Sequence, residues 1–172
     1  KPGISTSEID KLCYEYINDH QAFSAPLYYR GYPKSCCTSS NHVVCHGIPS
    51  EKILNDGDIL NVDVTAIKDG WHGDTSRMFV VGECSVKAKK LIKTTYQAMM
   101  EAIKIIKANI KIGNIGYTIQ KLVEAEGFSV VRDFCGHGIG KKFHESPNVL
   151  HYGEKNSGQE LKAGMIFTVE PM

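Results

Sequence analysis

The sequence lacks the features that mark several classes of protein. Its 172 residues carry 20 Lys and Arg against 19 Asp and Glu, so the formal charge is +1, and no basic block stands out for nucleic acid. No apolar run approaches the roughly 18 residues of a membrane span, and the amino-terminal residues lack the pattern of a signal peptide. These absences predict a cytoplasmic protein that binds neither nucleic acid nor membranes. We also expect a monomer.

Motifs of several enzyme and metal-site classes are missing as well. The six cysteines form no C-x-x-C pair, which argues against a structural zinc and favours reduced, mostly buried thiols. His144-Glu145 is followed by Asn148 where an H-E-x-x-H protease would have its second histidine, and no G-x-S-x-G elbow occurs. Lys141 stands where a G-x-G-x-x-G phosphate loop would need glycine. Zincins, elbow-type serine hydrolases and dinucleotide-binding proteins therefore lose support.

The sequence does contain an internal repeat. Two helical segments share one spacing of glycine and apolar residues, and two later segments share another that ends in a carboxylate. The glycines of the first match lie 110 residues apart and those of the second lie 107 apart, so the copies differ by three residues. The matched residues are Gly3, Ile9, Leu12, Leu54, Gly57, Ile59, Val62 and Asp63 in the first copy, and Gly113, Ile119, Leu122, Leu161, Gly164, Ile166, Val169 and Glu170 in the second.

This repeat predicts two copies of a helix-then-strand unit, about residues 1–84 and 110–172. No low-complexity linker divides the chain, so we expect both halves in one catalytic domain, 1–172. The order of elements predicts an α+β fold with antiparallel hairpins. Residues 153–158 are predicted to form an exposed loop.

Three amphipathic helices are predicted. Ser5 and Glu8 form a capping box that begins the first helix, Ser85 caps the second, and the third runs from about Asn114 to a stop at Gly127. The expected apolar faces are Ile9, Leu12, Cys13, Tyr16 and Ile17 in the first helix, Leu91, Ile92, Met99, Ile103 and Ile106 in the second, and Ile115, Ile119, Leu122 and Val123 in the third.

A β-hairpin is predicted around the turn signal Asp69-Gly70. A two-residue turn there pairs Lys68 with Trp71, and by alternation it pairs Thr65 with Asp74. The same register pairs Asp63 with Ser76 and places both aspartates on one face as diagonal neighbours.

Two carboxylates so close on a core-facing surface favour a bound cation, because each disfavours ionisation of the other. A solvated face would be the alternative, but Glu170 at the equivalent place in the repeat points to one site with three acids. His137 stands between two glycines that let the backbone approach closely, although a lone histidine is usually not a ligand. Oxygen donors with one imidazole suit Mn²⁺, Fe²⁺, Co²⁺ or Zn²⁺.

Four motifs resemble the metal-binding motifs of type I methionine aminopeptidases. They are Asn61-Val-Asp-Val-Thr65, Gly73-Asp-Thr-Ser76, Gly136-His-Gly-Ile-Gly140 and Thr168-Val-Glu-Pro171. Cys45-His-Gly-Ile-Pro49 and Phe143-His-Glu145 match further motifs, so the resemblance covers essentially the whole chain. It implies the pita-bread fold, whose two pseudo-symmetric halves carry an antiparallel sheet covered by helices.

The resemblance implies metal-dependent removal of the initiator methionine from nascent proteins. Asp63, Asp74, His137 and Glu170 would be ligands of two divalent ions (Co²⁺, Mn²⁺, Fe²⁺ or Zn²⁺), with Asp74 bridging them. The water between the ions would be the nucleophile that attacks the first peptide bond. The implied partner is the amino-terminal methionine of a nascent chain, with the ribosome as a further candidate.

The resemblance also assigns substrate contacts. His46 would contact the amide near the leaving nitrogen and His144 the peptide carbonyl, so that both are catalytic and substrate-binding residues. The methionine side-chain pocket would be lined by Tyr29, Tyr32, Cys37 and Phe143. Four other histidines match no motif of the family, namely His20, His42, His72 and His151.

The chain departs from the family at both ends. The family has a first helix before the segment that begins at Lys1, and a second bridging glutamate on a strand beyond the segment that ends at Met172. We therefore expect a fragment truncated at both ends, with weakened binding of the second metal.

Two other readings remain open. A peptidase of the same fold, such as prolidase or aminopeptidase P, would share the metals but cut at proline. A catalytically inactive module of this fold would bind protein partners, although such modules usually lose the ligands that are kept here. The motifs around His46 and His144 favour methionine.

Overall fold

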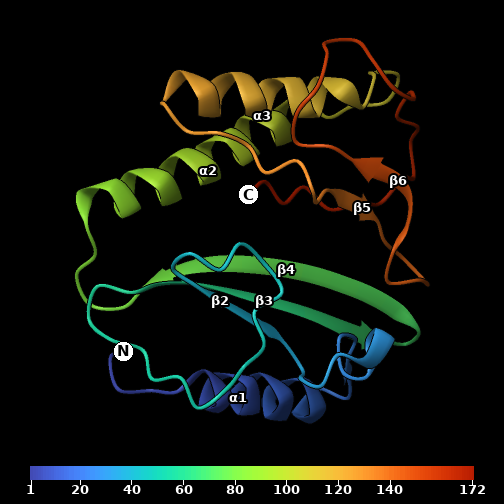
Figure 1. Cartoon of the computed structure of the whole chain (residues 1–172). Coiled ribbons are helices and arrows are strands. Elements are labelled where there is room, and N and C mark those ends of the chain that lie inside the picture. The colour runs from blue at the N-terminus through green and yellow to red at the C-terminus, as the bar shows by residue number, and fades with distance from the viewer. The chain divides into compact units, whose positions relative to one another are not determined.

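A computed structural model describes all 172 residues, Lys1–Met172, which divide into two compact units, Lys1–Ala88 and Lys89–Met172. Figure 1 shows the helices and strands of both. None of the helices is long and apolar enough to span a membrane.

The first unit is an antiparallel sheet with a helix against it. It contains α1 (Thr6–Asp19), β1 (Phe23–Ser24), the 3-10 helix η1 (Tyr29–Gly31), β2 (Cys37–Ser40), β3 (Ile59–Lys68) and β4 (Trp71–Val80). Strand β3 pairs with β4 along its whole length, and with β2 and β1 on its other edge. Figure 1 shows α1 running along one face of this sheet.

The predicted hairpin is confirmed residue by residue. Lys68 pairs with Trp71, Thr65 with Asp74 and Asp63 with Ser76. Asp69 and Gly70 have φ angles of 52° and 78°, the left-handed pair that a two-residue type I′ turn requires. The turn therefore fixes the register that brings the two aspartates onto one face.

Helix α1 begins where its capping box predicts, but the prediction of its buried apolar face is wrong in part. Ser5 and Glu8 make both bonds of the box, yet Leu12 and Tyr16 are 59% and 66% exposed. The inward positions instead include Asp10, whose carboxylate accepts hydrogen bonds from the backbone N–H groups of Ser35 at 2.8 Å and of the next residue at 3.1 Å. A polar contact with the segment that leads into β2 thus takes the place of an apolar contact.

The second unit packs two helices over a small sheet. Helix α2 (Val86–Lys104) leads into it, followed by α3 (Gly113–Ala125), β5 (Gly136–Gly138) and β6 (Glu145–Val149). Ser85 Oγ accepts from Ala88 N–H at 3.2 Å, and Gly127 follows α3 with φ +81°, so the predicted cap and stop are confirmed. Residues 153–158 lie in neither a helix nor a strand, as predicted.

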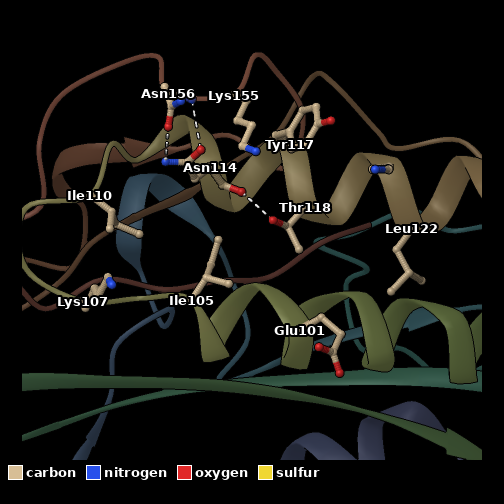
Figure 2. A pocket seen from close by; sticks show the side chains of 11 residues that line it. Glu101, Ile105, Lys107, Ile110, Asn114, Tyr117, Thr118, Leu122, Lys155 and Asn156 are labelled. Carbon is tan, nitrogen blue, oxygen red and sulfur yellow. Dashed lines mark hydrogen bonds between the residues drawn. The ribbon is translucent and has the colours of Figure 1, made fainter.

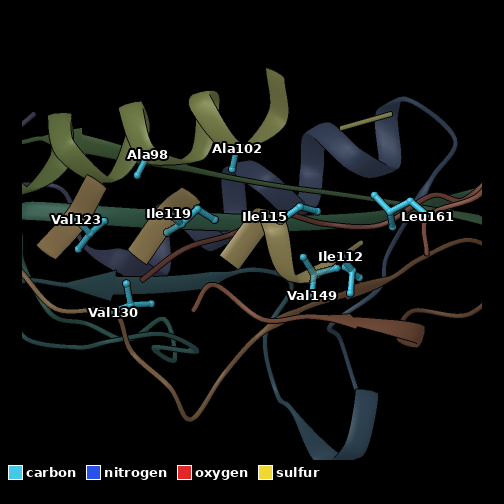
Figure 3. Packing of buried hydrophobic residues seen from close by; sticks show 9 residues of the cluster. All are labelled: Ala98, Ala102, Ile112, Ile115, Ile119, Val123, Val130, Val149 and Leu161. Atoms are coloured by element: carbon cyan, nitrogen blue, oxygen red, sulfur yellow. The ribbon is translucent and has the colours of Figure 1, made fainter. Parts of the chain in front are cut away.

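The core of the second unit lies between the two helices and β6. On α2 the buried residues are small, Thr94, Ala98 and Ala102, and Figure 3 shows the two alanines facing the side chains of α3. Leu91 and Ile103, which we expected on the apolar face, are 39% and 40% exposed. Small residues let the helices approach closely, so they define the contact. The buried cluster is Ala98, Ala102, Ile112, Ile115, Ile119, Val123, Val130, Val149 and Leu161.

The strand expected at the end of the second copy is reduced to a single bridge. Phe167 bridges Gly138 in antiparallel fashion, and Thr168 N–H donates to the His137 carbonyl at 2.8 Å. The equivalent segment of the first copy is the ten-residue strand β3. The repeat therefore holds in order but not in extent of strand pairing.

Backbone hydrogen bonds confirm a repeat and correct its alignment. The N–H of Gly3 donates to the Leu54 carbonyl, and that of Asn109 donates to the Leu161 carbonyl, each at 2.8 Å. Gly3 and Asn109 also share a positive φ, of 87° and 71°. The helical segments thus correspond at a separation of 106 residues, whereas the sequence match gave 110. A shift of four residues is about one helical turn and keeps the same face, so periodicity alone could not detect it.

Candidate metal and substrate site

The first unit holds two of the proposed ligands on adjacent strands. Asp63 on β3 and Asp74 on β4 are offset by two residues along the strands, as the hairpin register requires, and both are half-buried. Thr65 lies directly opposite Asp74 and is buried. On the other edge of β3, Cys37 of β2 lies directly opposite Asp63. The sheet thus places the Cys37 thiol opposite the Asp63 carboxylate, with the Asp74 carboxylate two residues along on the next strand.

The surroundings of the Cys37 thiol raise its pKa, and the two carboxylates contribute to this shift. Its pKa is raised to about 11, chiefly by burial and to a smaller extent by the charges of Asp63 and Asp74, while a hydrogen bond with Tyr32 lowers it. Cys37 is therefore a neutral thiol at neutral pH. Tyr32 donates its phenolic hydrogen to the carbonyls of Cys36 at 3.0 Å or Gly47 at 3.1 Å, and burial raises its pKa.

His46 lies on a loop that is held against β2. Thr38 N–H donates to the Gly47 carbonyl at 2.8 Å, and Gly47 N–H donates to Ser39 Oγ at 3.1 Å. A side chain at Gly47 would clash with the Thr38 carbonyl, so only glycine allows this approach. His46 itself is exposed and has φ +53°, a left-handed conformation that is uncommon for a side chain of this size.

In the second unit, the ring of His137 is oriented by its own strand. The residue is 8% exposed, and its Nδ1 lies 3.0 Å from the Gly138 carbonyl. A carbonyl only accepts, so Nδ1 carries the hydrogen and the Nε2 lone pair remains in the neutral ring. Nε2 lies 3.6 Å from Glu170 Oε1. An imidazole and a carboxylate that face each other in this way fit a shared cation.

Glu170 is held by two neighbours that the sequence motifs did not assign. Thr168 Oγ1 donates to Glu170 Oε1 at 2.5 Å and accepts from His137 N–H at 2.9 Å, so it joins the two residues. His151 Nε2 accepts the backbone N–H of Glu170 at 3.1 Å. His151 is 1% exposed, and burial lowers its pKa to about 4, so it stays neutral as an acceptor.

Phe143 and His144 complete a ring cluster around His137. The ring centroids of His144 and His137 are 4.2 Å apart, and Phe143 stacks on His144 at the same centroid distance. Phe143 also meets His137 edge-on at 6.3 Å. The second unit therefore brings together four predicted site residues, which are His137, Phe143, His144 and Glu170.

Close backbone approach explains the glycines beside His137. A Cβ at Gly136 would clash with the Thr168 carbonyl, and one at Gly138 would clash with the Ser146 carbonyl. Larger residues would push His137 away from the segment that carries Glu170.

Each unit thus supplies a pair of donors, two carboxylates in the first and an imidazole with a carboxylate in the second. No group of three or more His, Cys, Asp or Glu side chains forms a metal site within one unit. The donor chemistry of both pairs, oxygen with one imidazole and no thiolate, suits hard or borderline divalent ions. Tyr29 and Tyr32 belong to the first unit, where Tyr32 bonds to the Cys36 carbonyl next to β2, while Phe143 belongs to the second.

Sequence reasoning missed Thr168 and His151. Thr168 is the first residue of the motif that contains Glu170, so its place in the motif could have indicated a role at the site. His151 contacts a backbone N–H 19 residues away, and no local pattern predicts such a contact. All six cysteines are free, as expected, but only Cys36, Cys37 and Cys84 are buried.

Two curated relatives match the entire chain. A methionine aminopeptidase of Rickettsia prowazekii is 55% identical over 172 residues, and one of Escherichia coli strain K12 is 56% identical over 174 residues. The chain spans 66% of the length of each of these relatives.

Solved structures show the same fold. The crystal structure of methionine aminopeptidase from Rickettsia prowazekii matches 99% of the chain with a TM-score of 0.98 and 54% identity, and the chain covers 69% of it. The structure of an X-Pro aminopeptidase from Thermotoga maritima matches 99% of the chain with a TM-score of 0.81 and 24% identity. At this identity the match shows a common fold and nothing more. The pita-bread fold inferred from the motifs is therefore confirmed. Metallopeptidase family M24 matches residues 1–172 without a gap in coverage, and the chain belongs to this family.

Proposed function

We propose that this chain carries out metal-dependent removal of methionine from the amino terminus of new polypeptides. The observation that carries the proposal is its identity of 55% with a methionine aminopeptidase along its full length, with the motif residues in paired positions in both units. Relatives that cut at proline share the fold at a much lower identity. Methionine is therefore the preferred substrate class.

The proposed metal ligands are Asp63, Asp74, His137 and Glu170. Membership of family M24 implies divalent metal ions, and the oxygen-rich donor set favours Mn²⁺, Fe²⁺ or Co²⁺ and accommodates Zn²⁺. When bound, such ions lower the pKa of water and polarise a carbonyl group. The protein's contribution is to hold the ligands in place. The β3–β4 register does this for the aspartates, and Thr168 does it for Glu170.

His46 and His144 are proposed to position the substrate peptide and to stabilise charge as it develops. The His144 ring stacks on Phe143, and this contact orients it. His46 is held by a loop whose neighbours bond to β2 and whose left-handed backbone is the kind of strain that clusters at functional sites. Both histidines act by orientation and hydrogen bonding.

The residues proposed to contact the methionine side chain are Tyr29, Tyr32 and Cys37 of the first unit and Phe143 of the second. Cys37 supplies a neutral, polarizable thiol because burial and the two carboxylates raise its pKa. Such a surface suits the thioether of methionine. Tyr32 stays neutral, since its hydroxyl donates to backbone carbonyls and its pKa is raised.

The proposed partner follows from the substrate. The amino terminus of a new polypeptide first becomes available where chains leave the ribosome. We therefore propose a cytoplasmic protein that acts near the ribosome.

A panel of tripeptides tests the substrate class. The purified chain, supplied with Mn²⁺ or Co²⁺, is incubated with Met-Ala-Ser, Leu-Ala-Ser and Ala-Pro-Ser, and the released amino acid is quantified. Selective release of methionine is the expected result. Faster cleavage of Ala-Pro-Ser would assign the chain to the proline-specific peptidases of this fold, and equal release of leucine would refute the proposed pocket.

A further inference from the structure

A groove in the second unit is lined by no residue of the proposed active site. It has a volume of about 650 Å³ and lies between the end of α2, the outer side of α3 and the loop 153–158 (Figure 2). This volume falls within the range of about 300–1,000 Å³ that is typical of ligand pockets. We name it the α3 groove. It is lined by Glu101, Ile105, Lys107, Ile110, Asn114, Tyr117, Thr118, Lys121, Leu122, Lys155 and Asn156.

The middle of the α3 groove is apolar. Ile105, Ile110 and Leu122 line it, and Ile105 remains 36% exposed. Figure 2 shows Ile105 at the end of α2 pointing toward α3, and Leu122 pointing from α3 toward α2. An apolar side chain of a ligand would remove this surface from water.

The rim of the groove is basic. Lys107, Lys121 and Lys155 are exposed, and no carboxylate of the chain forms an ion pair with any of them. The Nζ atom of Lys121 lies over the Tyr117 ring, 6.0 Å from the ring centroid. The one acid of the lining, Glu101, is already paired with Lys104 at 2.6 Å.

Three other lysines of the same unit, by contrast, are paired with acids, and one of them is Lys104 beside the groove. Lys90 pairs with Glu126 at 3.1 Å and Lys111 pairs with Glu160 at 3.7 Å. The three rim lysines form no ion pair with the protein's own acids, so their positive charge is available to a ligand.

The frame of the groove is fixed before any ligand binds. Asn114 Nδ2 donates to Asn156 Oδ1 at 3.2 Å, and Asn156 N–H donates to Asn114 Oδ1 at 3.0 Å. Thr118 Oγ1 donates to the Asn114 carbonyl at 2.8 Å. The loop is thereby tied to the first turns of α3, so a ligand meets a preformed surface.

From these observations we infer that the α3 groove binds a short acidic peptide segment of a protein partner. An apolar side chain of the segment seats between Ile105, Ile110 and Leu122, and flanking carboxylates meet Lys107, Lys121 and Lys155. This function goes beyond peptide hydrolysis, because none of these residues belongs to the proposed metal or methionine sites.

The test uses fluorescence anisotropy with a labelled peptide, Asp-Glu-Leu-Asp-Glu, and the purified chain. A second peptide has glycine in place of leucine. The test variant combines K107E, K121E and K155E. The control combines K87E, K93E and K162E, which changes the net charge equally at three other exposed lysines. Circular dichroism and thermal unfolding verify that both variants fold.

We expect the test variant to bind the leucine peptide at least about tenfold more weakly than the control variant does. Binding should also weaken as salt rises and when leucine is replaced by glycine. Equal loss in both variants, no binding by the unmodified chain, or no effect of the leucine would overturn the inference. Equally tight, leucine-independent binding of an RNA oligonucleotide would instead identify a general polyanion surface.

Discussion

His137 Nε2 lies 3.6 Å from Glu170 Oε1, while its Nδ1 donates to the Gly138 carbonyl at 3.0 Å. When the ring is neutral with its hydrogen on Nδ1, Nε2 keeps its lone pair, and two electron-pair donors face each other. A cation between them would remove the repulsion. This relationship supports the proposal that the two residues bind a metal ion.

Replacing His137 with alanine should therefore weaken metal binding. The change removes a nitrogen donor, and loss of even an outer partner of a ligand costs about 10–100-fold in affinity, so we expect a loss of at least about 100-fold. Isothermal titration with Mn²⁺ measures it. The matched control is His20→Ala, an exposed histidine of the first unit. Equal affinities for the two variants would remove His137 from the ligand set.

Thr168 should act as a positioning residue for both His137 and Glu170. Thr168→Val keeps the shape but removes the hydroxyl that donates to Glu170 and accepts from His137 N–H. We expect metal affinity to fall by about 10–100-fold, whereas Thr168→Ser should retain most of it. Titration of both variants with Mn²⁺ distinguishes the hydroxyl from the packing of the methyl group. Similar losses in Ser and Val variants would contradict the role.

Gly136 should tolerate no side chain. In Gly136→Ala the added Cβ would collide with the Thr168 carbonyl, and overpacking of this kind costs about 1–3 kcal/mol of unfolding free energy. Gly73→Ala is the matched control, because no atom lies within 4 Å of a Cβ built there. Its effect should stay within about 0.5 kcal/mol. Urea unfolding of both variants measures the difference, and comparable costs would refute the close approach.

Buried His151 should make the protein sensitive to acid. Burial disfavours the charged ring and lowers its pKa to about 4 in the folded state, against 6.5 for a histidine exposed to water. At pH above 6.5 both states are neutral and no penalty exists. As the pH falls from 6.5 to 4 the unfolded chain takes up a proton that the folded chain excludes, so stability decreases, by about 3 kcal/mol in total.

The comparison with His151→Gln isolates this effect. A glutamine oxygen can still accept the Glu170 N–H but does not titrate. The difference in unfolding free energy between the original chain and the variant should change by about 3 kcal/mol between pH 7 and pH 4, in the direction that disfavours the original. A difference that is flat with pH would show that His151 is not held neutral.

The sequence predicts best what short-range chemistry decides. The Asp69-Gly70 turn has two residues, so it determines every pairing of β3 with β4 and hence the positions of Asp63 and Asp74. The capping box of α1 is equally local. In both cases the partners are close in sequence, and few alternatives compete.

Contacts between distant segments could not be predicted in this way. Asp10 turns inward because the backbone N–H groups at Ser35 and its neighbour need an acceptor, 25 residues away. On α2, the small residues Ala98 and Ala102 define the contact and leave Ile103 exposed. The alignment of the repeat was off by one helical turn, and the bonds of Gly3 and Asn109 were needed to correct it.

The most direct test of the central claim is the release of free methionine from Met-Ala-Ser by the purified 172-residue chain, measured after treatment with a chelator and after Mn²⁺ or Co²⁺ is restored. Our account predicts release that stops with the chelator, returns with the metal and is lost in Asp74→Asn. Release that persists in the chelator, or its absence from folded chain with bound metal, would contradict the proposal that these donors support hydrolysis.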